Sequence, residues 1–196
     1  MKGNNRTAAK KRTFNRSKSV TVVPTNWYVI TGGPCSGKTT TVAMLGKLGY
    51  RTTVEEARHY LDLQRANGRS LRDIERNRKR FQLKVLKEQI RQERMLDPAK
   101  IVFLDRAIPD ARAYYRFWGL PEDRVLTEAM ETVFYKKVFI LDCLPLVKDY
   151  ARHEDVAAQS RLQALLTDVY HSLPFQIIHV PVMPADLRVK LILENL

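Results

Sequence analysis

Short runs of apolar, β-branched residues alternate along the chain with longer segments in which apolar residues recur every three or four positions. The first pattern predicts buried strands, and the second predicts helices that bury one face. The predicted strands are residues 27–31, 51–54, 100–104, 137–142 and 175–180. The predicted helices are residues 40–48, 70–95, 111–118, 121–135, 155–171 and 184–196. This alternation indicates an α/β fold with about five parallel strands covered by helices on both faces.

The length of 196 residues allows one sizeable core and a tail. We expect residues 27–196 to form a single three-layer domain and residues 1–26 to precede it as a basic tail. No apolar run approaches the roughly 20 residues of a membrane-spanning helix, and the N-terminus has no apolar segment of the signal-peptide kind. The pattern therefore predicts a cytoplasmic protein without a membrane span.

The tail carries about half of the formal net charge of +13, since residues 1–26 contain seven basic residues and no acidic one. A segment so rich in Lys, Arg, Ser, Thr and Asn is expected to be disordered. Three roles stay open for it: a solubilising tail, an organelle transit peptide, or non-specific attraction to nucleic acid or acidic lipid.

The remaining positive charge lies along one predicted helix. Residues 69–95 contain ten basic residues and four acidic ones. This stretch is either a solvated face or a clamp for an anionic substrate or partner. Nucleic acid is not expected as a partner, because aromatic residues that could stack on bases are not interleaved with the charges. The two cysteines, Cys35 and Cys143, offer neither a disulfide framework nor metal-ligand spacing.

The strongest motif is a phosphate-binding loop between the first strand and the first helix. Residues 32–39 read Gly-Gly-Pro-Cys-Ser-Gly-Lys-Thr and fit the pattern G-x-x-x-x-G-K-[ST]. The glycines allow backbone N–H groups to point at a phosphate. Lys38 would add charge at the β- and γ-phosphates of ATP or GTP, and the Thr39 hydroxyl suits Mg²⁺. The expected nucleotide-binding residues are Gly32, Gly33, Pro34, Cys35, Ser36, Gly37, Lys38, Thr39 and Thr40.

Charged side chains also follow the second and third predicted strands, at the edge where ligands bind in open parallel sheets. Glu55 or Glu56 could accept a proton from a substrate hydroxyl or hold Mg²⁺ through water, but both could simply begin the next helix. Spacing alone does not choose between the two. Asp105 ends an apolar strand, as a Mg²⁺-binding Walker B residue does, and the adjacent Arg106 could neutralise phosphate or orient the acceptor.

Residues 145–154 are less apolar and more charged than their neighbours. They could close as a lid over the phosphates, with Arg152 supplying charge to the transition state. His153 is expected to be a surface residue, and Arg161 is either a second lid residue or a plain exposed arginine. Asp110 either begins a helix or reaches an acceptor.

Together these motifs resemble those of the small AAA-type ATP-binding domains related to the bacterial nicotinamide ribonucleoside kinase domain. The resemblance spans residues 27–196 and rests on residues 32–40, 55–58, 105–110 and 113–114, on Asp149, Arg152 and Glu154, and on Val180, Pro181 and Arg188. It implies a P-loop kinase-like fold that uses ATP or GTP and Mg²⁺. It also implies that Lys38 and Thr39 act in the loop, Asp105 at the metal and Arg152 in the lid. It implies no particular acceptor.

These features support three hypotheses of function. The first is a kinase that moves the γ-phosphoryl group of ATP to a nucleoside-like or other hydroxyl acceptor, because positioning and charge neutralisation are what this reaction needs. The second is a nucleotide-dependent switch that acts through a protein partner and needs no acceptor pocket. The third, a nucleic-acid-binding protein, predicts binding that weakens steeply with salt.

Overall fold

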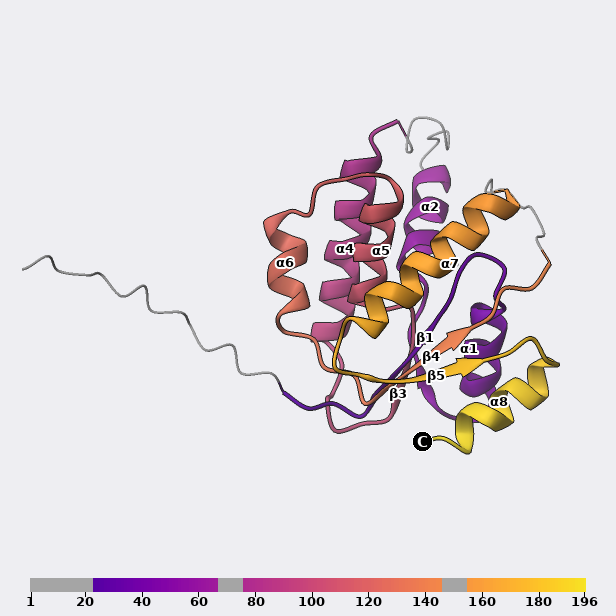
Figure 1. Ribbon diagram of the computed structural model, residues 1–196. Helices are drawn as coiled ribbons and strands as arrows, with labels where there is room; N and C mark the ends of the chain where they lie inside the picture. The colour runs from indigo at the N-terminus through magenta and orange to yellow at the C-terminus, as the bar shows by residue number, and fades with distance from the viewer. Residues whose placement is uncertain (1–22, 67–75, 146–154) are drawn as a thin grey trace, which may run out of the picture.

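A single parallel sheet forms the centre of the fold in the computed structural model, which describes residues 23–66, 76–145 and 155–196 (Figure 1). Its strands are β1 (Trp27–Thr31), β2 (Arg51–Thr52), β3 (Val102–Asp105), β4 (Lys137–Leu141) and β5 (Gln176–Val180). They lie in the order β2-β3-β1-β4-β5, and every neighbouring pair is parallel. The prediction of about five parallel strands is confirmed.

Seven helices of the described residues cover the two faces of this sheet. They are α1 (Lys38–Lys47), α2 (Glu56–Ala66), α4 (Arg78–Arg94), α5 (Ile108–Phe117), α6 (Arg124–Met130), α7 (Val156–His171) and α8 (Ala185–Leu193). Helices α1 and α8 lie on one side, and α4, α5, α6 and α7 lie on the other (Figure 1). The predicted three-layer α/β architecture is therefore confirmed. No helix in the described ranges is long and apolar enough to cross a membrane.

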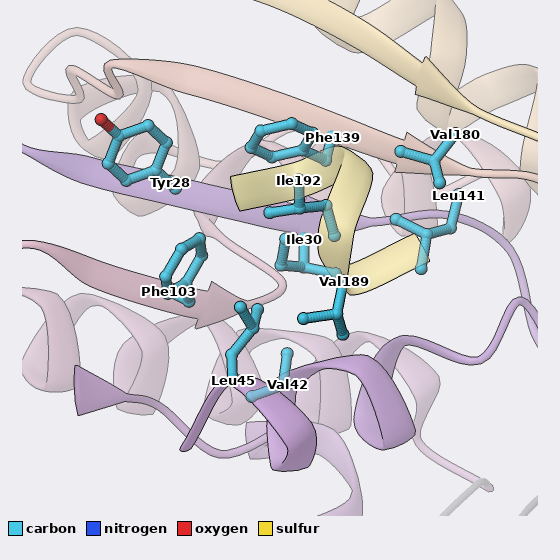
Figure 2. Packing of buried hydrophobic residues seen from close by; sticks show 10 residues of the cluster. All are labelled: Tyr28, Ile30, Val42, Leu45, Phe103, Phe139, Leu141, Val180, Val189 and Ile192. Atoms are coloured by element: carbon cyan, nitrogen blue, oxygen red, sulfur yellow. The ribbon is translucent and has the colours of Figure 1, made fainter. Parts of the chain in front are cut away.

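The alternation of side chains along β1 supplies both layers of the core. Tyr28 and Ile30 face α1 and α8, whereas Trp27 and Val29 face the opposite helices. Figure 2 shows the first of these layers, in which apolar side chains of α1 and α8 converge on the sheet. Because both faces of β1 are buried, its residues form a continuous apolar run, as expected for a central parallel strand.

The start of the long basic helix differs from the prediction. Residues 76 and 77 form a turn, and the Asn77 side chain caps α4 by accepting a hydrogen bond from the Arg80 backbone N at 3.0 Å. A helix that runs continuously from residue 70 is therefore wrong, and residues 70–75 lie outside the described part. Asparagine at an N-cap satisfies one of the unpaired amides at a helix start, so this cap is the physical reason for the later start.

Further boundaries differ from the expected ones. The helix predicted over residues 121–135 is shorter, since α6 covers only Arg124–Met130. Residues 108–110 form the first turn of α5 instead of a loop, since Pro109 stands where a helix needs no backbone N–H. Leu48, the last residue of the helix predicted over residues 40–48, follows the last helical residue of α1 and is 59% exposed. The predicted basic tail lies almost wholly in residues 1–22, outside the described part, and remains a prediction together with the domain boundary.

The register of the sheet brings the charged strand ends together. Ile30 of β1 pairs with Asp105 of β3, so Asp105 and Arg106 lie beside the start of the phosphate loop. The Thr53 hydroxyl accepts a hydrogen bond from the Asp105 backbone N at 3.0 Å, which fixes the end of β2 next to β3. Glu55 follows two residues later. The carboxyl edge of the sheet thus carries all the residues predicted to act after the second and third strands.

Candidate active site

The loop of residues 32–37 joins β1 to α1 and has the backbone conformation that its glycines allow. Gly32 has φ 141° and Gly37 has φ 78°, values that side chains with a Cβ rarely adopt. A Cβ at Gly32 would also clash with the Leu141 carbonyl oxygen, and one at Gly37 with the Arg188 guanidinium. The loop therefore needs glycine at both positions, for conformation and for space.

Three carbonyl groups of the loop bind donors on the elements that surround it. The Pro34 oxygen accepts from Gln159 Nε2 at 2.8 Å, the Cys35 oxygen from the Leu144 backbone N at 2.9 Å, and the Ser36 oxygen from Arg188 Nη1 at 2.8 Å. In a trans peptide the N–H points away from the carbonyl. The backbone N–H groups of residues 35–37 therefore face the inside of the loop, and they form the kind of concave nest that binds phosphate.

Lys38 lies across this nest. Its Nζ donates to the backbone oxygens of Gly32 and Gly33 at 2.9 and 2.8 Å, and to Ser36 Oγ at 3.1 Å. Burial, followed by the positive charge of Arg106, lowers the pKa of Lys38 to about 8. The ammonium is therefore mostly protonated at pH 7 and is held where a bound phosphate would meet it.

Thr39 and Asp105 lie together as their predicted metal role requires. The Thr39 side chain lies close enough to Asp105 to lower the pKa of its carboxylate, and Asp105 Oδ1 is buried without a hydrogen-bond partner. Burial and then the negative charge of Glu55 raise the pKa of Asp105 to about 6. A buried carboxylate with an unused oxygen beside a threonine hydroxyl fits Mg²⁺, which usually takes one or two protein oxygens together with substrate phosphates. The described ranges contain no cluster of three or more His, Cys, Asp or Glu residues that could hold a metal.

Glu55 and Arg106 form a buried ion pair at the mouth of the loop. Arg106 Nε donates to Glu55 Oε1 at 2.8 Å, and Arg106 Nη1 lies 3.5 Å from the Gly32 carbonyl oxygen. Burial raises the pKa of Glu55, but the positive charges of Arg106 and Lys38 outweigh it and bring the value to about 2. Glu55 is therefore ionised at neutral pH, whereas Asp105 keeps its proton up to a higher pH than Glu55 does.

Glu56 has different surroundings, although it is the next residue. It is the first residue of α2, and its Oε1 accepts a hydrogen bond from Gln92 Nε2 of α4 at 2.6 Å. Burial raises the pKa of Glu56. Both glutamates line the same cavity, but Glu55 pairs with Arg106 and Glu56 pairs with α4.

Asp110 is the centre of a buried network that sequence reasoning described only in part. Its Oδ1 accepts from Thr31 Oγ1 at 2.7 Å and from Arg106 Nη1 at 3.0 Å, and its Oδ2 accepts from the Tyr170 hydroxyl at 2.5 Å. Asp110 begins α5, as one alternative proposed, and it also anchors Arg106. Arg106 has φ 69°, which is unusual for a residue with a side chain, so this anchoring fixes a strained backbone.

A cavity of about 340 Å³ opens between the phosphate loop and helices α2, α4 and α5. Its polar wall contains residues 34–40, Glu55, Arg106 and Asp110. The apolar and aromatic part of the wall includes Leu61, Phe81, Val85, Leu86, Tyr114 and Trp118. The Arg78 guanidinium stacks 3.8 Å from the centroid of the Trp118 ring. A mostly apolar chamber with a few charged groups at one wall is typical of sites for small organic ligands.

The structure does not gather every predicted residue at this site. Thr40 is exposed on α1 and lines the cavity, whereas the predicted site residues Gly32, Gly33 and Asp105 do not line it. Arg161 is exposed on α7, and its guanidinium lies 5.3 Å from the centroid of the Phe117 ring. Arg152 and His153 lie outside the described residues, so the lid remains a prediction.

Sequence reasoning assigned no site role to four side chains that contact the loop or Asp110: Gln159, Gln163, Tyr170 and Arg188. All are distant in sequence from the groups they bind. The only local signal was a pair of glutamines four residues apart on a helix that also carries the buried leucines at positions 162 and 166.

Comparison with known proteins gives a family match and several similar folds. A family model described as an AAA domain matches residues 27–188. No curated protein matches this sequence. The deoxyadenosine kinase of M. mycoides, solved with dCMP and dCDP bound, superposes with a TM-score of 0.60 at 14% identity, covering 86% of this chain and 97% of that chain. Thymidylate kinase from Ehrlichia chaffeensis gives 0.59 at 14% identity and the same coverage.

The NadR protein in complex with NAD and AMP-PNP gives a TM-score of 0.62 at 14% identity. The match covers 86% of this chain and 48% of that chain, so this chain spans about half the length of NadR. At these identities the likeness concerns the fold, and it identifies the architecture as that of P-loop kinases.

Proposed function

Because the chain belongs to the AAA domain family, whose model matches residues 27–188, we propose that it binds a nucleoside triphosphate at the loop of residues 32–39. We further propose that it transfers the γ-phosphoryl group of ATP, or of GTP, to a hydroxyl group of a small nucleoside-like acceptor. Mg²⁺ is the proposed metal.

One observation carries this proposal: the phosphate loop, the Glu55–Arg106 pair and the aromatic chamber line one continuous cavity. A nucleotide-dependent switch needs the loop but not a chamber that opens beside it. A kinase needs both, because the acceptor hydroxyl must lie in line with the γ-phosphoryl group. The cavity therefore favours a kinase over a switch.

The charged residues have distinct proposed roles. The loop amides and Lys38 bind the phosphates, and Arg106 neutralises charge that develops on the transferred group. Glu55 accepts a hydrogen bond from the acceptor hydroxyl and orients it. Since its pKa is about 2, Glu55 is a weak base, which suits a reaction whose transition state is loose and needs little proton removal. Arg152 stays a predicted lid residue outside the described part.

Thr39 and Asp105 are the residues that would hold Mg²⁺. When bound, this ion would neutralise charge on the β- and γ-phosphate oxygens. The proximity of the Thr39 side chain to the Asp105 carboxylate, together with the unpartnered Asp105 Oδ1, supports this role.

The aromatic wall supports an acceptor that contains a flat ring. Phe81, Tyr114 and Trp118 contribute ring surfaces to the cavity, and aromatic rings gain from stacked or edge-to-face contacts. The names of the similar structures, a deoxyadenosine kinase and a thymidylate kinase, fit a nucleoside-like acceptor.

The direct test is release of nucleoside diphosphate from ATP and GTP with Mg²⁺, alone and with a panel of nucleosides, nucleotides and sugars. An acceptor that accelerates release at least about tenfold, equivalent to 1.4 kcal/mol of barrier, would support the kinase and name its substrate. Slow release with every acceptor, while nucleotide still binds, would favour the switch. Acceptor binding can be followed by the fluorescence of Trp118, since the second tryptophan, Trp27, is buried away from the cavity.

Replacement of Asp105 by asparagine is expected to raise the Mg²⁺ concentration needed for half-maximal rate by about 10- to 100-fold, the usual effect of losing a group that supports a metal. Nucleotide binding without metal should change little. In the wild type, the apparent Mg²⁺ affinity should fall below about pH 6, because a proton then competes for Asp105. Equal loss of metal-dependent and metal-free binding in Asp105→Asn would make this residue structural.

A further inference from the structure

Two glutamines of α7, one helical turn apart, bind the first half of the phosphate loop. Gln159 Nε2 donates to the carbonyl oxygens of Pro34 at 2.8 Å and Leu144 at 3.2 Å. Gln163 Oε1 accepts from the Gly33 backbone N at 2.5 Å, and its Nε2 donates to the Leu141 carbonyl oxygen at 3.3 Å. Gln163 therefore ties the loop to the last residue of β4, and Gln159 ties it to the segment that follows this strand.

The bond from Gln159 acts on a strained peptide. The Pro34 carbonyl and the Cys35 N–H belong to the same peptide unit, and Cys35 has φ 56°, in the left-handed region that residues with a Cβ avoid. A flip of this peptide plane would bring Cys35 back toward negative φ. It would also turn the Pro34 oxygen into the nest in place of the Cys35 N–H, where it would repel a phosphate. Gln159 stabilises the orientation that phosphate needs.

Gln163 acts on the peptide between Gly32 and Gly33, two units earlier in the loop. The Gly33 N–H binds Gln163, and the carbonyl at the other end of the same unit, that of Gly32, binds Lys38 Nζ at 2.9 Å. With glycine on both sides, this peptide has few conformational restraints of its own. Gln163 and Lys38 therefore hold its two ends, and the position of the ammonium depends on Gln163.

We propose that Gln159 and Gln163 are positioning residues of the phosphate loop, which keep its peptides oriented for phosphate before any ligand arrives. This rests on the proposed function only in taking the loop as a phosphate site. A site whose donors are already oriented loses less conformational freedom on binding. Removal of either glutamine should therefore weaken phosphate binding more than it affects the rest of the fold.

The test is calorimetric titration of the full chain with MgADP and with inorganic tripolyphosphate, using wild type, Gln159→Met and Gln163→Met. Methionine keeps the length of the side chain and removes its hydrogen bonds. We expect the dissociation constant to rise by about 3- to 10-fold in each variant, the usual effect of one buried hydrogen bond, and equally for both ligands. Ser160→Ala, at an exposed position on the same helix, should bind as wild type.

A second substitution separates positioning from general loosening. Cys35→Gly removes the penalty of the left-handed conformation, so in the Gln159→Met background it should restore most of the lost affinity. It should restore none in the Gln163→Met background, which affects a different peptide. Thermal unfolding checks that each variant is folded. If Gln159→Met does not fold, Gln163→Met alone carries the test of affinity.

The outcomes separate this proposal from the proposed function. Wild-type affinity in folded Gln159→Met and Gln163→Met would overturn the positioning role and leave the nucleotide site intact. Loss of affinity in Gln159→Met that Cys35→Gly does not repair would overturn the peptide-flip argument. A wild-type protein that binds neither MgADP nor tripolyphosphate would overturn the proposed function itself.

Discussion

Replacement of Lys38 by methionine is expected to lower the rate of γ-phosphoryl transfer about 100- to 1,000-fold, the usual effect of removing one group that stabilises transition-state charge. Lys38 is 5% exposed and donates to three oxygens of the loop. Among the residues that the structure describes, no other lysine lines the cavity. Methionine keeps most of the aliphatic stem, so the fold should persist.

The measurement is the initial rate of diphosphate release with the best acceptor, together with circular dichroism during thermal unfolding. Lys47→Met is the matched control, since Lys47 is exposed in the last turn of the same helix. It should keep the wild-type rate. Full activity in a folded Lys38→Met protein would show that the phosphate loop does not take part in the mechanism.

The pH dependence of kcat/KM provides a second test of the role of Lys38. Because the pKa of Lys38 is about 8 in the free protein, the ammonium loses its proton as the pH rises through that value. The ratio kcat/KM for nucleotide, which reports groups of the free enzyme, should therefore fall above about pH 8. In Lys38→Met this fall should disappear from the residual activity. A wild-type profile that stays flat to pH 10 would contradict the assignment.

The phosphate loop could be predicted from sequence because its determinants are local. Residues 32–39 specify the turn by their own conformations, with glycine at two of the three positions of positive φ. A Cβ at Gly32 would also clash with a backbone oxygen. The strand before and the helix after follow from short-range apolar patterns. Asp105 and Arg106 could be placed for a related reason, since a buried parallel strand delivers its last residues to one edge of the sheet.

The choice between Glu55 and Glu56 could not be predicted, because it depends on a distant residue. Gln92, which binds Glu56, lies 36 positions later on α4. The partners of the loop are more distant still: 125 positions separate Pro34 from Gln159, and 152 separate Ser36 from Arg188. A single polar residue on a helix gives no sign of which backbone group it will meet. Such contacts become visible only when the helices are packed.

The polar residues on the buried face of α4 could not be predicted either. The sequence predicted an apolar face, but the buried residues include Gln89 and Glu93. Glu93 accepts hydrogen bonds from Gln89, from the Tyr135 hydroxyl at 2.8 Å and from the Ile108 backbone N at 3.2 Å. Burial raises the pKa of Glu93 to about 7. A buried carboxylate is tolerated here because three donors satisfy it, and these donors come from three separate segments.

Replacement of Glu55 by glutamine is expected to reduce kcat with the acceptor about 10- to 100-fold, the usual effect of losing a hydrogen bond to a charged group. Glutamine keeps an oxygen that can accept from Arg106 Nε, now at 2.8 Å from Glu55 Oε1, so the geometry should survive while the negative charge is lost. A neutral amide accepts a weaker hydrogen bond from the acceptor hydroxyl than a carboxylate does. Nucleotide affinity should therefore stay near the wild-type value while transfer slows.

Glu56→Gln is the matched control, because it changes the same atoms one residue away. Glu56 binds Gln92 instead of Arg106, so this variant should retain the wild-type rate within about threefold, as expected for a residue that does not contact the reacting groups. Since the pKa of Glu55 is about 2, protonation of this residue should not affect the wild-type rate between pH 5 and 7. Because the negative charge of Glu55 raises the pKa of Asp105, the loss of Mg²⁺ affinity on the acid side should move to lower pH in Glu55→Gln. An equal loss of kcat in the two variants would mean that the glutamates act by shaping the start of α2. A larger loss of kcat in Glu56→Gln would indicate that the acceptor binds on the α4 side of the cavity.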